Sequence, residues 1–87
     1  MELAELRKSL DEIDEQIVSL YEKRMKICAG VAEYKIETGK QVLDTAREAE
    51  KIAKVKEMVK DPVNRQGVEE LFEQIMSMSR KLQYKML

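Results

Sequence analysis

The sequence predicts an all-α protein with one very long N-terminal helix and two shorter helices, in which two copies of the chain intertwine as a helical bundle. Apolar residues recur at alternating three- and four-residue steps from Leu3 to Tyr34, as in a helix that packs along its length. Two further apolar stripes of helical period follow in the second half of the chain. The 87 residues are expected to form one domain, which as a compact globule would measure roughly 30 Å across.

The first helix is expected to run from near Glu2 to about Glu37. Gly39 is the expected stop signal, because glycine accepts the left-handed conformation that a helix end often needs. A helix of this length is about 50 Å long and overshoots the globule. The overshoot carries apolar residues that need a cover, so we expect an intertwined homodimer. The apolar seam comprises Leu3, Leu6, Leu10, Ile13, Ile17, Leu20, Ile27, Val31 and Tyr34.

The second helix is expected to run from about Thr45 or Ala46 to Lys60. Thr45 with Glu48 three positions later fits a capping box, in which each side chain bonds to a free backbone N–H of the first turn, and Asp44 is an alternative N-cap. The inner side of this helix is expected to carry Ala49, Ile52, Val55 or Lys56, and Val59.

The third helix is expected to begin at Pro62 or Asn64. The pair Asp61-Pro62 ends the second helix, because proline disfavours the helical conformation for the residue before it. Met76 and Met78 are interpreted as core residues rather than as an adaptable binding surface, since they lie at helical spacing with their apolar neighbours. The stripe comprises Val68, Leu71, Phe72, Ile75, Met76, Met78 and Leu82.

Composition excludes several classes of function. A net charge of -1, with 38% charged residues of both signs, gives no broad basic field for nucleic acid or a membrane surface. The chain has no histidine, which removes Ser-His-Asp and Cys-His catalysis and His-ligated metal sites. Cys28, the one cysteine, is interpreted as a small buried hydrophobe. Neither a signal peptide nor an apolar run of membrane-spanning length is evident, so we expect a soluble cytoplasmic protein.

Three cations on the first helix indicate an anion site. Arg24 interrupts the apolar seam, and a charge on a core face usually has an anionic partner. Lys35 lies eleven residues further on, within about 20° of the same helix face and about 16 Å along the axis. Arg7 lies seventeen residues before Arg24, about 26 Å away along the axis and about 100° around it. If Arg7 serves the same site, a second copy of the chain must deliver it.

Polar residues of the other two helices complete the candidate site. The second helix begins with Asp44, Arg47 and Glu48, and a helix start is a favourable place to hold charged groups. The third helix carries Ser79 and Gln83 one turn apart, on one face. Taken singly, each residue has an ordinary structural explanation, such as a register-fixing ion pair or a boundary position. Their joint occurrence favours a polar pocket without metal ligands.

This combination of residues resembles the all-helical class of chorismate mutases, over nearly the whole chain and in register. Departures are small: many members have a proline where this chain has Gln41, and often a second basic residue where it has Met25. Neither position touches the substrate in the family, so no loss of function is expected. The resemblance rests on eight polar positions at the family's spacing, namely Arg7, Arg24, Lys35, Asp44, Arg47, Glu48, Ser79 and Gln83.

The resemblance implies a domain-swapped homodimer with two active sites. Each site would convert chorismate to prephenate by an intramolecular Claisen rearrangement, a step of phenylalanine and tyrosine biosynthesis that needs no cofactor. By the same resemblance, Arg7 from the partner chain would hold the two substrate carboxylates together with Arg24 and Arg47.

The resemblance also assigns the remaining polar residues. Lys35 and Gln83 would donate hydrogen bonds to the ether oxygen whose bond breaks. Glu48, with Asp44, would receive the ring hydroxyl, and Ser79 would add a hydrogen bond near a carboxylate.

Two other functions remain open from the sequence. An isochorismate-pyruvate lyase shares this fold and most of the cations, although the pair Asp44 and Glu48 favours the mutase. The alternative without catalysis is a mutase-like regulatory or dimerisation module, and retention of all eight positions speaks against it.

Overall fold

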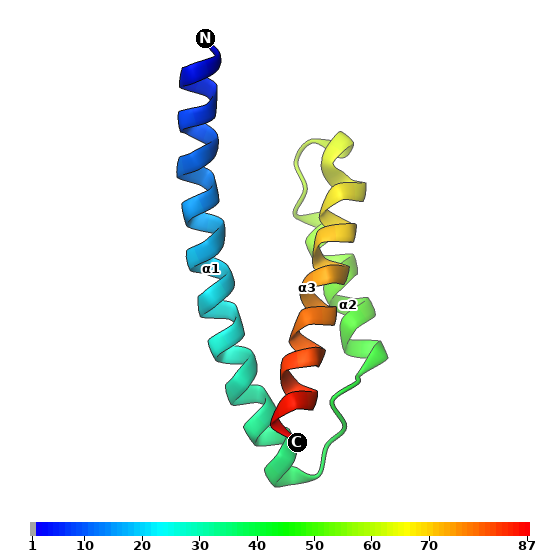
Figure 1. The fold of residues 1–87 in the computed structure, drawn as a ribbon. Coiled ribbons are helices and arrows are strands. Elements are labelled where there is room, and N and C mark those ends of the chain that lie inside the picture. Colours follow the sequence, from blue (N-terminus) through cyan, green and yellow to red (C-terminus); the bar gives the residue numbers. More distant parts are fainter. Residues whose placement is uncertain (1) are drawn as a thin grey trace.

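Three α-helices, joined by short connections, make up the computed structural model, which describes residues 2–87. The helices are α1 (Leu3–Thr38), α2 (Thr45–Glu57) and α3 (Arg65–Met86), and a short 3-10 turn, η1 (Pro62–Asn64), precedes α3. α3 packs against both α1 and α2, and α1 extends alone beyond the other two helices (Figure 1). The structure is therefore elongated, with extents of 54 × 25 × 15 Å. The prediction of an all-helical fold with one very long N-terminal helix is confirmed.

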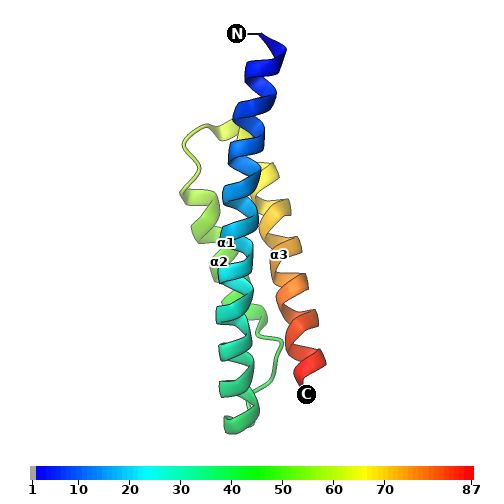
Figure 2. The same cartoon turned by 60° about the vertical axis from the view of Figure 1, so that its left-hand side comes forward.

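The end of α1 follows the predicted signal. Gly39 adopts the left-handed conformation with φ 71°, and the backbone N–H of Lys40 bonds to the carbonyl of Lys35 at 3.0 Å. This geometry satisfies carbonyl groups that the last helical turn leaves free. The connection after Gly39 leads to α2, and a second view shows α2 partly hidden by α1 and α3 running antiparallel to α2 on the other side of α1 (Figure 2).

The start of α2 uses Asp44 as its N-cap. The Asp44 carboxylate accepts a hydrogen bond from the backbone N–H of Arg47 at 3.0 Å, whereas Thr45 is already the first helical residue. Of the two predicted starts of this helix, the Asp44 cap forms and the capping box of Thr45 and Glu48 does not. Asp44 fits this position because a carboxylate both accepts the free N–H and complements the positive end of the helix dipole.

The end of α2 comes earlier than the sequence predicts, at Glu57 rather than Lys60. The backbone N–H of Val59 bonds to the carbonyl of Lys56 at 3.3 Å, so the last turn tightens to three-residue bonds. Asp61 must be extended before Pro62, and its side chain caps η1 by accepting from the N–H of Val63. The chain therefore leaves the helical conformation a few residues before the proline.

Gly39 and Gly67 give a matched test of the left-handed helix cap, because one glycine ends α1 and the other lies within α3. Replacing Gly39 with alanine is expected to lower the free energy of unfolding by about 1 kcal/mol, because only the positive φ is strained and the added Cβ meets open space. Gly67→Ala, inside α3 and equally open, is expected to raise it by up to about 1 kcal/mol. Urea unfolding at one fixed chain concentration measures both changes, and a stabilised Gly39→Ala would contradict this account.

The buried core of the single chain is small. Its apolar members are Ala32, Val42, Val55 and Met76. Met76 is thus a core residue as predicted, and Met78 is half-buried, where its sulfur accepts a hydrogen bond from the Tyr21 hydroxyl. Ala49 and Leu71, two expected core positions, are exposed.

Most of the apolar seam of α1 has no cover within the chain. Every described residue up to Leu20 is exposed, and Ile27 further along retains 69% of its accessible surface. An uncovered apolar stripe of this length is what an interface with another molecule requires. A single chain does not test the intertwined homodimer, which stays a prediction. Within residues 2–87, no helix carries an apolar stretch sufficient to cross a bilayer.

Candidate active site

A cavity of about 180 Å³ lies where the C-terminal half of α1, the start of α2 and the last turns of α3 meet. It brings together residues that are far apart in the sequence. Seven of the eight predicted site residues line it, namely Arg24, Lys35, Asp44, Arg47, Glu48, Ser79 and Gln83. Arg7 is the exception, because it lies on the exposed N-terminal half of α1 and does not line the cavity.

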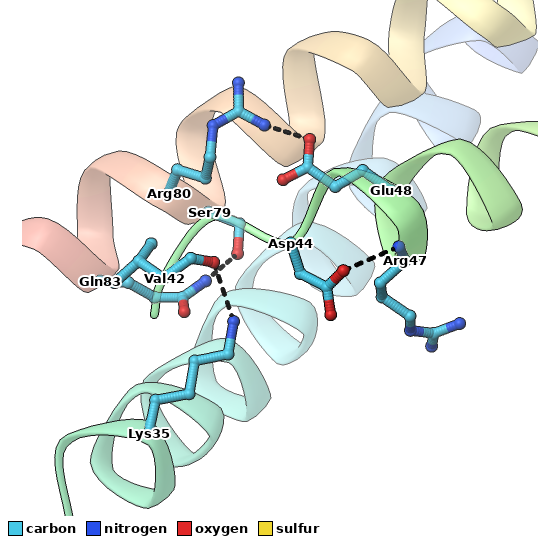
Figure 3. Close-up of polar contacts among 8 residues, drawn as sticks. All are labelled: Lys35, Val42, Asp44, Arg47, Glu48, Ser79, Arg80 and Gln83. Carbon is cyan, nitrogen blue, oxygen red and sulfur yellow. Dashed lines mark hydrogen bonds and ion pairs between the residues drawn. The ribbon is translucent and has the colours of Figure 1, made fainter. Parts of the chain in front are cut away.

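The two cations from α1 are half-buried and differ in their contacts. The Lys35 ammonium donates a hydrogen bond to the carbonyl of Val42 at 2.9 Å (Figure 3), which ties the end of α1 to the connection before α2. Arg24 approaches the sulfur of Cys28 one turn along the helix, at 3.6 Å. Among residues 2–87, Arg24 has no carboxylate partner. Its charge is therefore available to a ligand in the cavity.

The start of α2 contributes two carboxylates and a cation. The Asp44 carboxylate caps the helix, and the exposed Arg47 side chain extends from the first turn (Figure 3). Glu48 forms an ion pair with Arg80 of α3, which the sequence does not predict. This pair links the two helices at the edge of the cavity.

Ser79 and Gln83 are the two buried polar residues among residues 2–87, with 8% and 6% of their surface exposed. Their individual interpretation as boundary residues is wrong, because α3 turns this face inward. The Gln83 amide nitrogen donates to the Ser79 hydroxyl at 3.1 Å. The Gln83 amide oxygen is buried and has no hydrogen-bond partner within the described part of the chain. A buried atom without a hydrogen-bond partner typically costs ~1–3 kcal/mol.

Sequence reasoning missed two cationic residues that line the cavity, Arg80 and Lys51. Each had a signal in its spacing. Arg80 precedes Gln83 by three positions and Lys51 follows Glu48 by three, which is the separation of neighbours on one helix face. Cys28, interpreted as a buried hydrophobe, is half-buried and lines the cavity as well.

The cavity carries an excess of positive charge. Five cationic side chains and two carboxylates line it, which leaves a surplus of three positive charges. No cluster of potential metal ligands occurs among the described residues. Ammonium, guanidinium and amide donors that face a small cavity can bind and orient a small organic anion.

The fold and the cavity together define a class of protein: a small helical protein with a cavity that is lined by cations from three helices. The comparison with family models specifies it further. The chain belongs to the chorismate mutase type II family, whose model matches residues 6–84. The predicted resemblance is thereby confirmed at the level of the family. No curated protein and no solved structure matches the chain significantly.

Proposed function

We propose that this protein is a chorismate mutase, an isomerase that converts chorismate to prephenate in aromatic amino-acid biosynthesis. Family membership supports the reaction class. The observation that carries the proposal is the buried Gln83 amide beside the Lys35 ammonium in a cavity of net positive charge. These are the donors that a developing oxyanion requires.

The rearrangement is concerted, so it suits a site without histidine. The ether C–O bond of chorismate breaks while a C–C bond forms between the side chain and the ring, and no proton or group leaves the molecule. The protein must hold the flexible enolpyruvyl arm over the ring, and such positioning contributes up to ~7–11 kcal/mol in well-oriented intramolecular systems.

Arginines would hold the two substrate carboxylates. Arg24 and Arg47 line the cavity, and a guanidinium matches a carboxylate with two parallel hydrogen bonds. Arg7 would complete the set from a second copy of the chain, since its own helix carries it away from the cavity. The exposed apolar seam of α1 supports this dimer, because a partner's helices would cover it.

Lys35 and Gln83 would stabilise the ether oxygen as its bond stretches. The Lys35 ammonium has three donors, so it can keep the Val42 carbonyl and still donate to the substrate. For Gln83, a half-turn of the amide group would let the Ser79 hydroxyl donate to the amide oxygen and free the amide nitrogen for the ether oxygen. That orientation also satisfies the buried atom that lacks a partner. In that orientation Gln83 uses the one O–H of Ser79, so Ser79 would act by positioning the Gln83 amide.

The ring hydroxyl of chorismate would bind to the carboxylates of α2. Glu48 and Asp44 both line the cavity, and a carboxylate accepts a hydrogen bond from a hydroxyl group. This pair favours the mutase over the alternative of the same fold, an isochorismate-pyruvate lyase.

Product analysis tests the proposal directly. Purified protein mixed with chorismate is expected to remove the chorismate absorbance, with prephenate as the product. Release of pyruvate from isochorismate, without prephenate from chorismate, would instead support the lyase. No turnover of either substrate would leave a regulatory or dimerisation module and overturn the proposed activity.

The neutral Gln83 amide predicts the pH dependence. With an amide as donor, kcat is expected to be nearly flat from neutral to mildly alkaline pH, because the amide does not titrate. In Gln83→Glu the new carboxyl donates only while protonated, so activity should be present at low pH and lost as pH rises, by at least about tenfold from pH 5 to 8. Gln83→Met, which cannot donate, should be slow at every pH. A flat profile for Gln83→Glu would contradict a donor role at this position.

A further inference from the structure

Arg80 lies in the candidate site, although neither the spacing analysis nor the family resemblance assigns it a role. It follows Ser79 on α3, lines the cavity and forms an ion pair with Glu48 of α2 (Figure 3). The Arg80 and Glu48 side chains retain 29% and 27% of their accessible surface, so the pair is largely shielded from water. A charge pair that is shielded in this way restricts both side chains more firmly than an exposed one does.

The pair engages one oxygen of Glu48 and leaves the other unused. Arg80 donates to Oε1, and Oε2 accepts no hydrogen bond from any residue in the range 2–87. A carboxylate has about four lone-pair sites, so this contact anchors Oε1 of Glu48 at the guanidinium and leaves Oε2 free to accept a hydrogen bond. Arg80 therefore holds Glu48 in place without occupying all of its hydrogen-bond acceptor sites.

The pair also balances charge. Without Arg80, Glu48 would lose the cation at contact distance and would repel more strongly a substrate that itself carries two negative charges. A cation at contact distance reduces the repulsion between the Glu48 carboxylate and another anion. Arg80 contacts Glu48 through one of its terminal nitrogens, so one effect of Arg80 on a ligand passes through that carboxylate.

We propose that Arg80 is a positioning residue that holds Glu48 in the orientation that receives the ring hydroxyl, and so makes the site selective for a substrate with that hydroxyl. This inference rests on the proposed mutase activity. A site built around a hydroxyl discriminates strongly against an analogue that lacks it, because a buried polar group is then left unpaired. Loss of Arg80 should therefore reduce selectivity as well as rate.

The test compares chorismate with its analogue in which hydrogen replaces the ring hydroxyl. For Arg80→Met, kcat/KM for chorismate is expected to fall by roughly ten- to thirtyfold, while kcat/KM for the analogue changes by less than about threefold. Arg80→Lys, which keeps the charge, should recover part of the selectivity. In a Glu48→Gln background, adding Arg80→Met should change kcat/KM for chorismate by less than about threefold, because the two residues act as one unit.

Lys56 supplies a matched control. Lys56 and Glu69 form the other ion pair between α2 and α3, at 3.4 Å and with similar exposure, but neither residue lines the cavity. Lys56→Met should therefore leave both the rate and the selectivity ratio within about twofold of wild type. Unfolding curves of the two single variants should shift by similar amounts if both pairs contribute similarly to the fold.

The outcomes separate this inference from the proposed function. An active wild-type enzyme whose Arg80→Met variant loses equal activity on both substrates would overturn the positioning role and leave the mutase standing. Fully multiplicative effects of Glu48→Gln and Arg80→Met would do the same, since Arg80 would then act independently of Glu48. A wild-type protein without turnover of chorismate would overturn both.

Discussion

Lys35→Ala is expected to lower kcat/KM for chorismate by about 1,000-fold while the helical fold persists, because removal of one oxyanion donor costs ~10²–10³ in rate and this donor is also charged. The Lys35 ammonium lies at the cavity and already holds one hydrogen bond, so its position is fixed before substrate binds. A pre-positioned donor needs little reorganisation as the ether bond stretches. The loss should therefore appear mainly in kcat. A coupled absorbance assay at saturating and limiting chorismate measures both constants.

The control for this variant is a lysine of the same chain outside the cavity. Lys54 is exposed on α2, and Lys54→Ala should retain kcat/KM within about twofold of wild type. Circular dichroism of Lys35→Ala should match wild type, since Lys35 leaves only the Val42 carbonyl without its side-chain donor. An unchanged kcat/KM for Lys35→Ala would remove the main electrostatic contribution of the proposed mechanism.

Mixing two inactive variants, Arg7→Ala and Lys35→Ala, is expected to restore activity. In a dimer that exchanges Arg7 between chains, one site of the mixed dimer combines the intact Arg7 of one copy with the intact Lys35 of the other. Random exchange makes half of the dimers mixed, and each has one intact site of two, so the mixture should reach about one quarter of the wild-type rate. The separate variants should each remain near the background rate. Activity measured during chain exchange follows the recovery.

The matched control mixes Arg24→Ala with Lys35→Ala. Both residues line the same cavity from the same helix, so every site in the mixed dimer lacks one of them and activity should stay at background. Tagged chains that co-purify would establish that exchange has occurred. Proven exchange of Arg7→Ala with Lys35→Ala, without recovery, would mean that Arg7 acts within its own chain or has no role.

Local features of the fold were predictable because they depend on neighbouring residues. The C-terminal end of α1 depends on one glycine, and the start of α2 depends on a short polar side chain, both of which act within a few residues. The end of α2 is less predictable. Pro62 requires an extended Asp61, but the sequence does not indicate how many residues before Asp61 leave the helical conformation. Helix periodicity alone does not give that number.

The site was predictable as a set of residues and less so as a set of contacts. The spacing of Arg24 and Lys35 on one helix is fixed by helix geometry, and both line the cavity. The ion pair between Glu48 and Arg80 depends on how α2 and α3 are rotated about their axes, which sequence spacing within one helix does not determine. The burial of Gln83 depends on the same packing.

The buried amide oxygen of Gln83 has no partner in the described part of the chain. The amide at this position therefore lowers the stability of the fold while it supplies a donor for the reaction. A methionine or leucine of similar size would remove the unsatisfied atom from this buried position of α3. Substitutions at this position that raise the thermal stability would therefore tend to remove the hydrogen-bond donor. A polar residue survives there only under continuous selection for turnover.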